Sequence, residues 1–154
     1  MTEEKENMPQ SMIHPTAIID PQAEIGPGVK IGPYAVIGPH VKIGAGTEVM
    51  AHVTIDGWTE PQDLKYHGEK SYLIIGDRSV FREFVTVSTA TGEGEETRIG
   101  SDCLFQACTH VAHNCVVGNH VIMSNCAGLA GHVTVEDRVV IGGIAGVHQF
   151  VKVV

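Results

Sequence analysis

The chain has 154 residues, a formal net charge of −8 at pH 7, and a composition that is 43% hydrophobic but only 5% aromatic. This apolar fraction argues against disorder, and the length suits one domain. The acidity argues against a protein that binds duplex nucleic acid, because phosphate backbones attract basic surfaces. No apolar run approaches the roughly 20 residues that span a bilayer, and the polar start MTEEKENMPQSM is not a signal peptide.

We expect residues 1–11 to be a disordered tail and residues 12–154 to form the domain. The four cysteines show no paired spacing, which is typical of reduced thiols in a cytoplasmic protein. Glycine is in excess, because 18 of 154 residues are about 12%, against a usual 7% or so. With so few large side chains, a layered aromatic core is excluded.

A six-residue period runs through the domain. Apolar residues occupy every sixth position of a first run: Ile13, Ile19, Ile25, Ile31, Ile37, Ile43, Val49 and Ile55. They occupy a second register at Ile75, Phe81 and Val87, and then at Ile99, Phe105, Val111, Val117, Met123, Leu129, Val135, Ile141, Val147 and Val153. The position four residues later is small or β-branched, and the position directly after the apolar residue is often glycine.

A period of six is neither that of a helix nor that of a long strand. Each hexad predicts one short strand and one turn, with the apolar and the small residue pointing inward. We expect glycine to permit the corner conformation. Three hexads close a triangle of 18 residues, and stacked triangles form parallel ladders about 4.8 Å apart. The sequence therefore predicts an all-β, single-stranded parallel β-helix.

Two segments interrupt the repeats. Ile55 and Ile75 are 20 residues apart, which is not a multiple of six, so we expect an excursion near residues 56–74. Residues 88–98 keep the register but are too polar and glycine-rich for a core strand, which predicts a second excursion. Long loops on a rigid scaffold often carry function.

Stacking at intervals of 18 gathers several of the nine histidines. The columns are His113, Gly131 and Gln149; Asn114, His132 and Phe150; Ala112, Ala130 and His148; and His110, Gly128 and Gly146. Four histidines thus share one edge above a floor of small residues. Imidazole suits general acid–base chemistry near neutral pH. We expect His14, His40, His52 and His120, in contrast, to be solvent-exposed.

Two other interpretations of these residues remain. Three imidazoles can hold zinc, as in the γ-type carbonic anhydrases on this scaffold, but the H-V-A-H spacing differs and we expect no acidic side chain beside these histidines. We predict no metal site. Cys108 and Cys126 also stack, at a spacing that a disulfide can bridge, although reduced thiols are expected.

Three motifs carry a family resemblance: Q-D-L-K-Y-H-G-E at residues 62–69, H-V-A-H-N-C-V-V-G-N at 110–119, and L-A-G-H-V with G-V-H-Q-F at 129–133 and 146–150. With them, residues 12–154 resemble the UDP-N-acetylglucosamine acyltransferases, the first enzymes of lipid A biosynthesis. The resemblance implies a left-handed β-helix and a cytoplasmic homotrimer with active sites between subunits. It also implies transfer of a 3-hydroxyacyl chain from acyl carrier protein to the 3-hydroxyl of UDP-GlcNAc. No cofactor is implied, because the phosphopantetheine thioester of the carrier protein is already activated.

The resemblance also assigns roles to residues. His113 would be the general base, the backbone N–H of Gly131 would stabilise the oxyanion, and Asn114 would orient His113. The substrate contacts would come from Gln62, Asp63, Lys65, His110, His132, His148 and Gln149, with the first three reaching the nucleotide sugar from a neighbouring subunit and Lys65 near phosphate.

The chain departs from the family pattern at three points. Many members have Asp where this chain has Asn114, which cannot offset a positive imidazolium. About one 18-residue coil is missing before residue 60. The helical C-terminal domain, with the acyl-chain ruler, is expected to be absent beyond Val154. Alternatives are the related N-acyltransferase, an acetyl-CoA-dependent acetyltransferase, and a non-catalytic or metal-binding β-helix.

Overall fold

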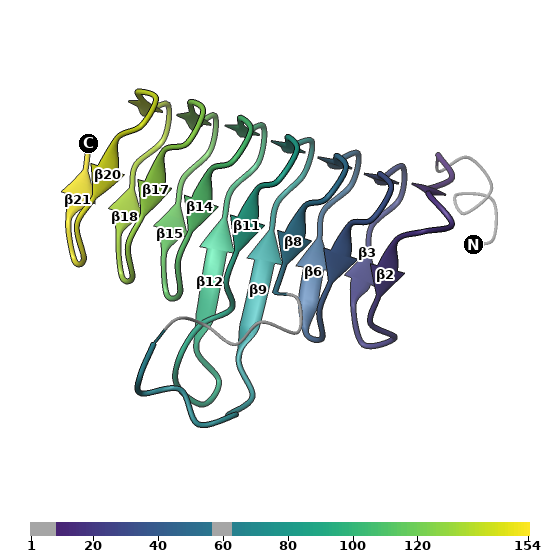
Figure 1. The fold of residues 1–154 in the computed structure, drawn as a ribbon, viewed down its shortest axis with the longest axis horizontal. Coiled ribbons are helices and arrows are strands. Elements are labelled where there is room, and N and C mark those ends of the chain that lie inside the picture. Colours follow the sequence, from purple (N-terminus) through teal and green to yellow (C-terminus); the bar gives the residue numbers. More distant parts are fainter. Residues whose placement is uncertain (1–8, 57–62) are drawn as a thin grey trace, which may run out of the picture.

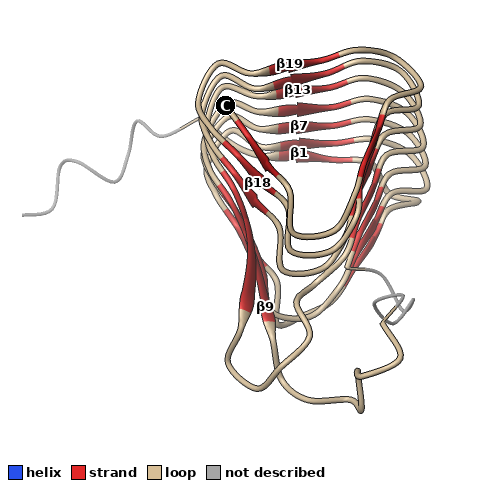
Figure 2. Cartoon of the chain, turned by 90° about the vertical axis from the view of Figure 1, so that its left-hand side faces the viewer, coloured by secondary structure: helices blue, strands red, loops and turns tan. Residues whose placement is uncertain are grey.

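The chain forms a left-handed parallel β-helix with a triangular cross-section. The computed structural model describes residues 9–56 and 63–154, which form 21 short strands in three parallel sheets of seven. Figure 1 shows the coils stacked side by side, and Figure 2 looks along the stack. No helix occurs in the described part of the chain. The predicted fold class, a single-stranded left-handed parallel β-helix, is confirmed.

Each sheet takes one strand from every coil, so its strands are three apart in chain order. Sheet A contains β1 (Met12–Ile13), β4 (Lys30–Ile31), β7 (Glu48–Val49), β10 (Val80–Phe81), β13 (Leu104–Phe105), β16 (Ile122–Met123) and β19 (Val140–Ile141). Sheet B contains β2 (Ile18–Ile19), β5 (Val36–Ile37), β8 (Thr54–Ile55), β11 (Thr86–Val87), β14 (His110–Val111), β17 (Gly128–Leu129) and β20 (Gly146–Val147). Sheet C contains β3 (Glu24–Ile25), β6 (Val41–Ile43), β9 (Tyr72–Ile75), β12 (Glu96–Ile99), β15 (Val116–Val117), β18 (Thr134–Val135) and β21 (Lys152–Val153).

The register of the sheets confirms the 18-residue coil. Ile13 pairs with Ile31, and Val111 pairs with Leu129. The offset rises to 32 across the first excursion, where Val49 pairs with Phe81, and to 24 across the second, where Phe81 pairs with Phe105. Both excursions thus leave the stack and return to it without disturbing the order of the coils.

The core is a narrow column inside the triangle, and it holds the residues that the hexads predict. The apolar series from Ile31 to Val135 is buried, and each inward residue stacks on its equivalent in the next coil. Phe81 and Phe105 show this best, because their rings are parallel with centroids 4.8 Å apart. Burying such side chains is the main stabilising term for a sheet-only fold.

The glycines after the apolar residues have another role than the predicted one. The left-handed corner positions are mostly filled by other residues, such as Tyr34 and His120 (both φ 57°). The repeat glycines instead lie against the backbone of the next coil. A Cβ on Gly26 would lie 2.8 Å from the carbonyl oxygen of Ile43. A Cβ on Gly38 would overlap the carbonyl oxygen of Asp56. The expectation that glycine shapes the corners holds at Gly28 and Gly46, which have φ of 68° and 67°. It was wrong for most of the glycines that follow the apolar residues, because close contact between stacked coils selects them.

One corner carries an exposed ladder of side chains in the left-handed conformation. The rings of Tyr34, His52 and Phe84 stack with centroids 5.2 and 5.0 Å apart. Cys108 and Cys126 continue the same column on the next two coils. All five residues are solvent-exposed, so this corner contributes little to the core.

The two excursions join into a single arm that projects from one corner (Figure 2). Their strands are longer than the others: β9 and β12 pair over four residues, from Glu96 opposite Tyr72 to Ile99 opposite Ile75. Both strands begin inside the ranges expected for the excursions, because Leu73 and Thr97 alternate inward and are buried. Gly94 N–H also donates to the carbonyl of Lys70. The predicted tail falls mostly on residues 1–8, outside the described part.

Candidate active site

A hollow of about 370 Å³ lies on the outer face of sheet B, over β14, β17 and β20. Its lining comes from four successive coils and is dominated by small residues: Ser88, His110, Ala112, His113, Gly128, Leu129, Ala130, Gly131, Gly146, Val147 and Gln149. Two glycines leave the space over the strands open. A Cβ added to Gly128 or Gly146 would have no heavy atom within 4 Å. The stacking columns therefore predicted most of this surface.

His113 occupies the turn after β14 and is 8% exposed. Its Nδ1 lies 2.9 Å from Oδ1 of Asn114. The same Oδ1 accepts the backbone N–H of Thr91, and Asn114 Nδ2 donates to the Thr91 carbonyl. These two bonds fix which amide atom is oxygen, so Nδ1 of His113 is the donor. The remaining ring nitrogen, Nε2, then carries the lone pair that a general base needs.

Gly131 lies directly beneath this imidazole. A Cβ at Gly131 would come within 2.5 Å of both Cε1 and Nε2 of His113. Nε2 therefore faces the backbone of the next coil, inside the hollow. The backbone N–H of Gly131 has no hydrogen-bond acceptor among residues 9–56 and 63–154. It is available to a ligand at this point, beside the basic nitrogen.

An acidic side chain approaches His113 from the first excursion. Oδ2 of Asp63 lies 3.8 Å from Nδ1 of His113, and both side chains are largely buried. The pKa of Asp63 is lowered, first by the Lys65 backbone N–H that donates to its carboxylate and then by further hydrogen bonding and the nearby His113. The expectation that no acid lies beside the histidines was wrong, because the excursion folds back onto the corner of its own chain.

Two further histidines flank the base. His110 lies on β14 with Nδ1 2.8 Å from the Thr86 hydroxyl, and its pKa is lowered by burial and then by His113. The ring of His132 contacts that of His113 edge to face at 5.2 Å and stacks on Phe150 at 4.7 Å. Its pKa is also lowered, by desolvation and then by His113. Both rings therefore favour the neutral form and can exchange hydrogen bonds without adding charge.

The other predicted site residues make fewer contacts with His113 and its neighbours. Gln149 lines the hollow, whereas the side chain of His148 is exposed, with its Nδ1 3.4 Å from the Gln149 carbonyl oxygen. Lys65 is exposed on the excursion. Gln62 lies outside the described residues. Thr86, Ser88 and Thr91 border or support the site and were missed. Thr86 opens β11 and carries no acid–base group, and Ser88 and Thr91 lie beyond β11, where the repeat pattern stops.

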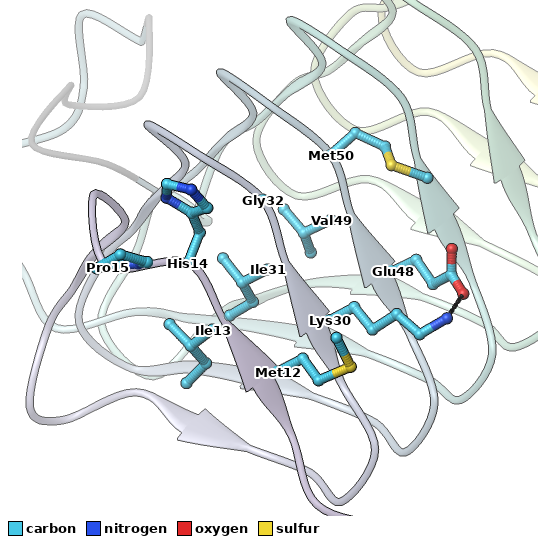
Figure 3. Close-up of a pocket in the computed structure, with 10 residues that line it drawn as sticks. All are labelled: Met12, Ile13, His14, Pro15, Lys30, Ile31, Gly32, Glu48, Val49 and Met50. Carbon is cyan, nitrogen blue, oxygen red and sulfur yellow. Dashed lines mark hydrogen bonds and ion pairs between the residues drawn. The ribbon is translucent and has the colours of Figure 1, made fainter.

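A slightly larger hollow, of about 400 Å³, lies over β1, β4 and β7 (Figure 3). Its lining is mostly apolar. Its two charged side chains, Lys30 and Glu48, pair at 2.7 Å, and its one histidine, His14, has its Nδ1 2.9 Å from the Thr16 hydroxyl. It thus offers no free acid–base pair, and we take the hollow around His113 as the candidate active site. Within the described ranges, no three His, Cys, Asp or Glu side chains lie together as potential metal ligands.

Comparison with known proteins agrees with the fold and with the motifs. The family model described as the GMPPB C-terminal domain matches residues 9–113, so the repeat region belongs to that family of domains. The chain is 55% identical over 105 residues to the acyl-[acyl-carrier-protein]–UDP-N-acetylglucosamine O-acyltransferase of Stenotrophomonas maltophilia, and 53% identical over 95 residues to that of Gloeothece citriformis. These matches cover 68% and 62% of this chain.

Solved structures extend the match to nearly the whole chain. A crystal structure of UDP-N-acetylglucosamine acyltransferase is 43% identical over 91% of this chain, with a TM-score of 0.79. LpxA of Acinetobacter baumannii is 43% identical over 92%, with a TM-score of 0.77. The chain belongs to the UDP-N-acetylglucosamine acyltransferase family. It spans 39% and 34% of the length of the two curated members of this acyltransferase family and 61% of each solved chain. No helix in the described part is long and apolar enough to cross a membrane.

Proposed function

We propose that the chain supplies the catalytic β-helix of an acyltransferase that moves a 3-hydroxyacyl chain from acyl carrier protein to the 3-hydroxyl of UDP-GlcNAc, the first step of lipid A biosynthesis. The observation that carries the proposal is the imidazole of His113, whose Nδ1 is bonded to Asn114 and whose Nε2 faces the hollow over Gly131. Relatives that match this region carry the corresponding activity in their names.

In this proposal, Nε2 of His113 takes the proton of the sugar hydroxyl as its oxygen attacks the thioester carbonyl. The new C–O bond forms, and the negative charge on the carbonyl oxygen is stabilised by the N–H of Gly131, a type of contact worth about 3 kcal/mol. The C–S bond then breaks, and His113 returns the proton to the phosphopantetheine thiolate. The donor is already activated, so the step needs no soluble cofactor.

The surrounding residues have binding and positioning roles. Asn114 holds the ring of His113 and joins it to the second excursion through Thr91. Asp63 is the only described carboxylate in ion-pair range of His113, and it stabilises the imidazolium that forms during transfer. His110, His132, His148 and Gln149 contact the substrates, and Gln62 and Lys65 hold the nucleotide, with the Lys65 ammonium near phosphate.

We also infer a cytoplasmic homotrimer in which neighbouring subunits complete each active site. The interior of the sheet B hollow is open to one side and holds base and oxyanion donor from one chain. A second chain would cover this open side and exclude water from the reacting atoms. Light scattering at several concentrations tests the trimer, and a monomer at all of them would contradict it.

The test of the activity is acyl transfer from 3-hydroxyacyl carrier protein to UDP-GlcNAc. His113→Ala should lower the rate by about 10²–10⁴-fold, the usual contribution of a general base. His120→Ala is the matched control, because this exposed histidine lies at a different corner, and it should keep the wild-type rate. Equal rates for wild type and His113→Ala would remove His113 as the base. Faster transfer from acetyl-CoA than from the carrier protein would assign the chain to the acetyltransferases instead.

A further inference from the structure

Two exposed thiols lie on successive coils at the corner between sheets A and B. Cys108 connects β13 to β14, and Cys126 connects β16 to β17. The strands on either side pair at an offset of 18. The N–H of Cys126 donates to the carbonyl of Ala107, at 3.0 Å. Cys108 and Cys126 are therefore adjacent rungs of one ladder.

The geometry of this ladder suits a disulfide. Neighbouring rungs of a parallel sheet lie about 4.8 Å apart, inside the range of about 4.4–6.8 Å between the Cα atoms of bridged cysteines. Both residues have φ 61°, so their Cβ atoms leave the backbone in the same direction, at about the same separation as the Cα atoms. A small closing movement of the two exposed turns brings them to the roughly 3.5–4.5 Å between the Cβ atoms of a bridge. Each thiol also faces solvent, where a small oxidant or reductant can reach it.

The other two cysteines provide an internal contrast. Cys103 and Cys115 point into the core, where their Sγ atoms donate to the carbonyls of Gly118 and Ala130, at 3.2 and 3.1 Å. Burial raises the pKa of both, that of Cys115 to about 11. Thiols in such surroundings are poor nucleophiles and are shielded from reagents. Only the corner pair is placed for exchange.

We propose that Cys108 and Cys126 form a reversible dithiol–disulfide pair that reacts with small-molecule disulfides. One thiolate attacks a sulfur of the oxidant, and one small thiol leaves. The second thiolate then attacks the mixed disulfide and releases a second small thiol. The protein loses two electrons and two protons, and the oxidant disulfide is reduced to two thiols.

The pair lies at the rim of the candidate active site, although the proposed acyl transfer does not use it. Cys108 is two residues before His110, and Cys126 is two residues before Gly128, and both of these later residues line the hollow. A bridge would tie together the turns that precede β14 and β17. Oxidation would therefore fix the spacing of two coils at the edge of the substrate site.

The experiment incubates the full chain with oxidised and reduced glutathione in a series of ratios, followed by acid quenching, alkylation and intact mass measurement. We expect one step in which the protein loses two hydrogen atoms and two alkylation sites, with peptide mapping that joins Cys108 to Cys126. Addition of excess reduced glutathione should reverse it. A covalent dimer on a non-reducing gel would overturn the proposal, because it would place the bridge between chains.

Matched variants distinguish a bridge from independent reactions. Cys108→Ser and Cys126→Ser should each keep one glutathione as a stable mixed disulfide, since the second thiol that would displace it is gone. Cys103→Ala should form the bridge like the wild type. If the wild type instead retains a separate glutathione on each corner thiol at every ratio, the two sulfurs do not meet and the proposal is wrong. Circular dichroism of each variant confirms that the fold is kept.

Discussion

The imidazole of His113 rests on the backbone of Gly131, so closely that a single methyl group on the glycine would meet Cε1 and Nε2 at 2.5 Å. The two residues belong to successive coils and are 18 positions apart, and the register of sheet B holds them in contact. The orientation of the proposed base thus depends on a residue with no side chain.

Gly131→Ala should displace the imidazole and lower the rate of acyl transfer by at least about 10²-fold, since small misplacements of a catalytic group are costly. The movement should also appear as a shift of the His113 Cε1–H resonance in the NMR spectrum. Gly142→Ala is the control, because a Cβ there meets nothing within 4 Å. An unchanged His113 resonance in Gly131→Ala would contradict the contact.

Asn114→Gly should release the second excursion from the β-helix. The change removes the amide that bonds to His113 and to both backbone groups of Thr91, whereas glycine tolerates the φ of 57° at this corner. We expect a loss of about 1–3 kcal/mol in the free energy of unfolding and faster hydrogen exchange at Thr91 N–H. His120→Gly, at another corner with the same φ, should leave the exchange of Thr91 unchanged.

Asp56 should make the protein less stable as the pH rises. Burial raises the pKa of this carboxyl to about 7, although the Thr89 N–H that bonds to it acts in the opposite direction. The folded state therefore favours the protonated form, and stability falls between about pH 4, where the unfolded chain ionises, and about pH 7. Asp56→Asn should abolish this decrease.

Urea unfolding at about pH 5 and about pH 8 measures the effect of Asp56. His110 and His132 act in the opposite direction, because their lowered pKa values add stability as the unfolded histidines lose their protons. The informative quantity is thus the difference between wild type and Asp56→Asn at each pH. A difference that does not change with pH would show that Asp56 is not titrating in this range.

Gly128→Leu should block the hollow without unfolding the protein. A Cβ at Gly128 meets nothing within 4 Å, so the new side chain can extend into the open space over sheet B. We expect the melting temperature to stay within a few degrees of the wild type and substrate binding to be lost, as followed by calorimetry with UDP-GlcNAc and with the acylated carrier protein. Undiminished binding of both would place the substrates elsewhere.

The repetitive part of this structure was predictable from the sequence, and so was much of the candidate site. With a coil of 18 residues, positions that differ by 18 lie in one column. This rule gives two columns whose six residues all line the hollow: His113, Gly131 and Gln149, and His110, Gly128 and Gly146. The role of the repeat glycines was not predictable in the same way. Periodicity shows where glycine recurs, but not whether the backbone angle or the next coil requires it.

The contacts of the two excursions were not predictable from the repeat. Residues outside the repeat have no register in the stack, so their spacing does not indicate which coil their side chains contact. Asp63 reaches His113 and Thr91 reaches Asn114 through contacts that depend on the three-dimensional path of the arm. These contacts connect the arm to the proposed base, and the repeat pattern carries no signal for them.

A stack in which every coil touches only the coil before it and the coil after it can change length locally. His113, Gly131 and Gln149 belong to three consecutive coils, and the arm docks on the first of them at Asn114. Adding or removing a whole coil among β1–β8 would leave all these relationships intact. Coils can therefore be gained or lost in the N-terminal half during evolution without changing the site. A gain or loss of a coil in the half that carries the histidines would separate the residues of the site.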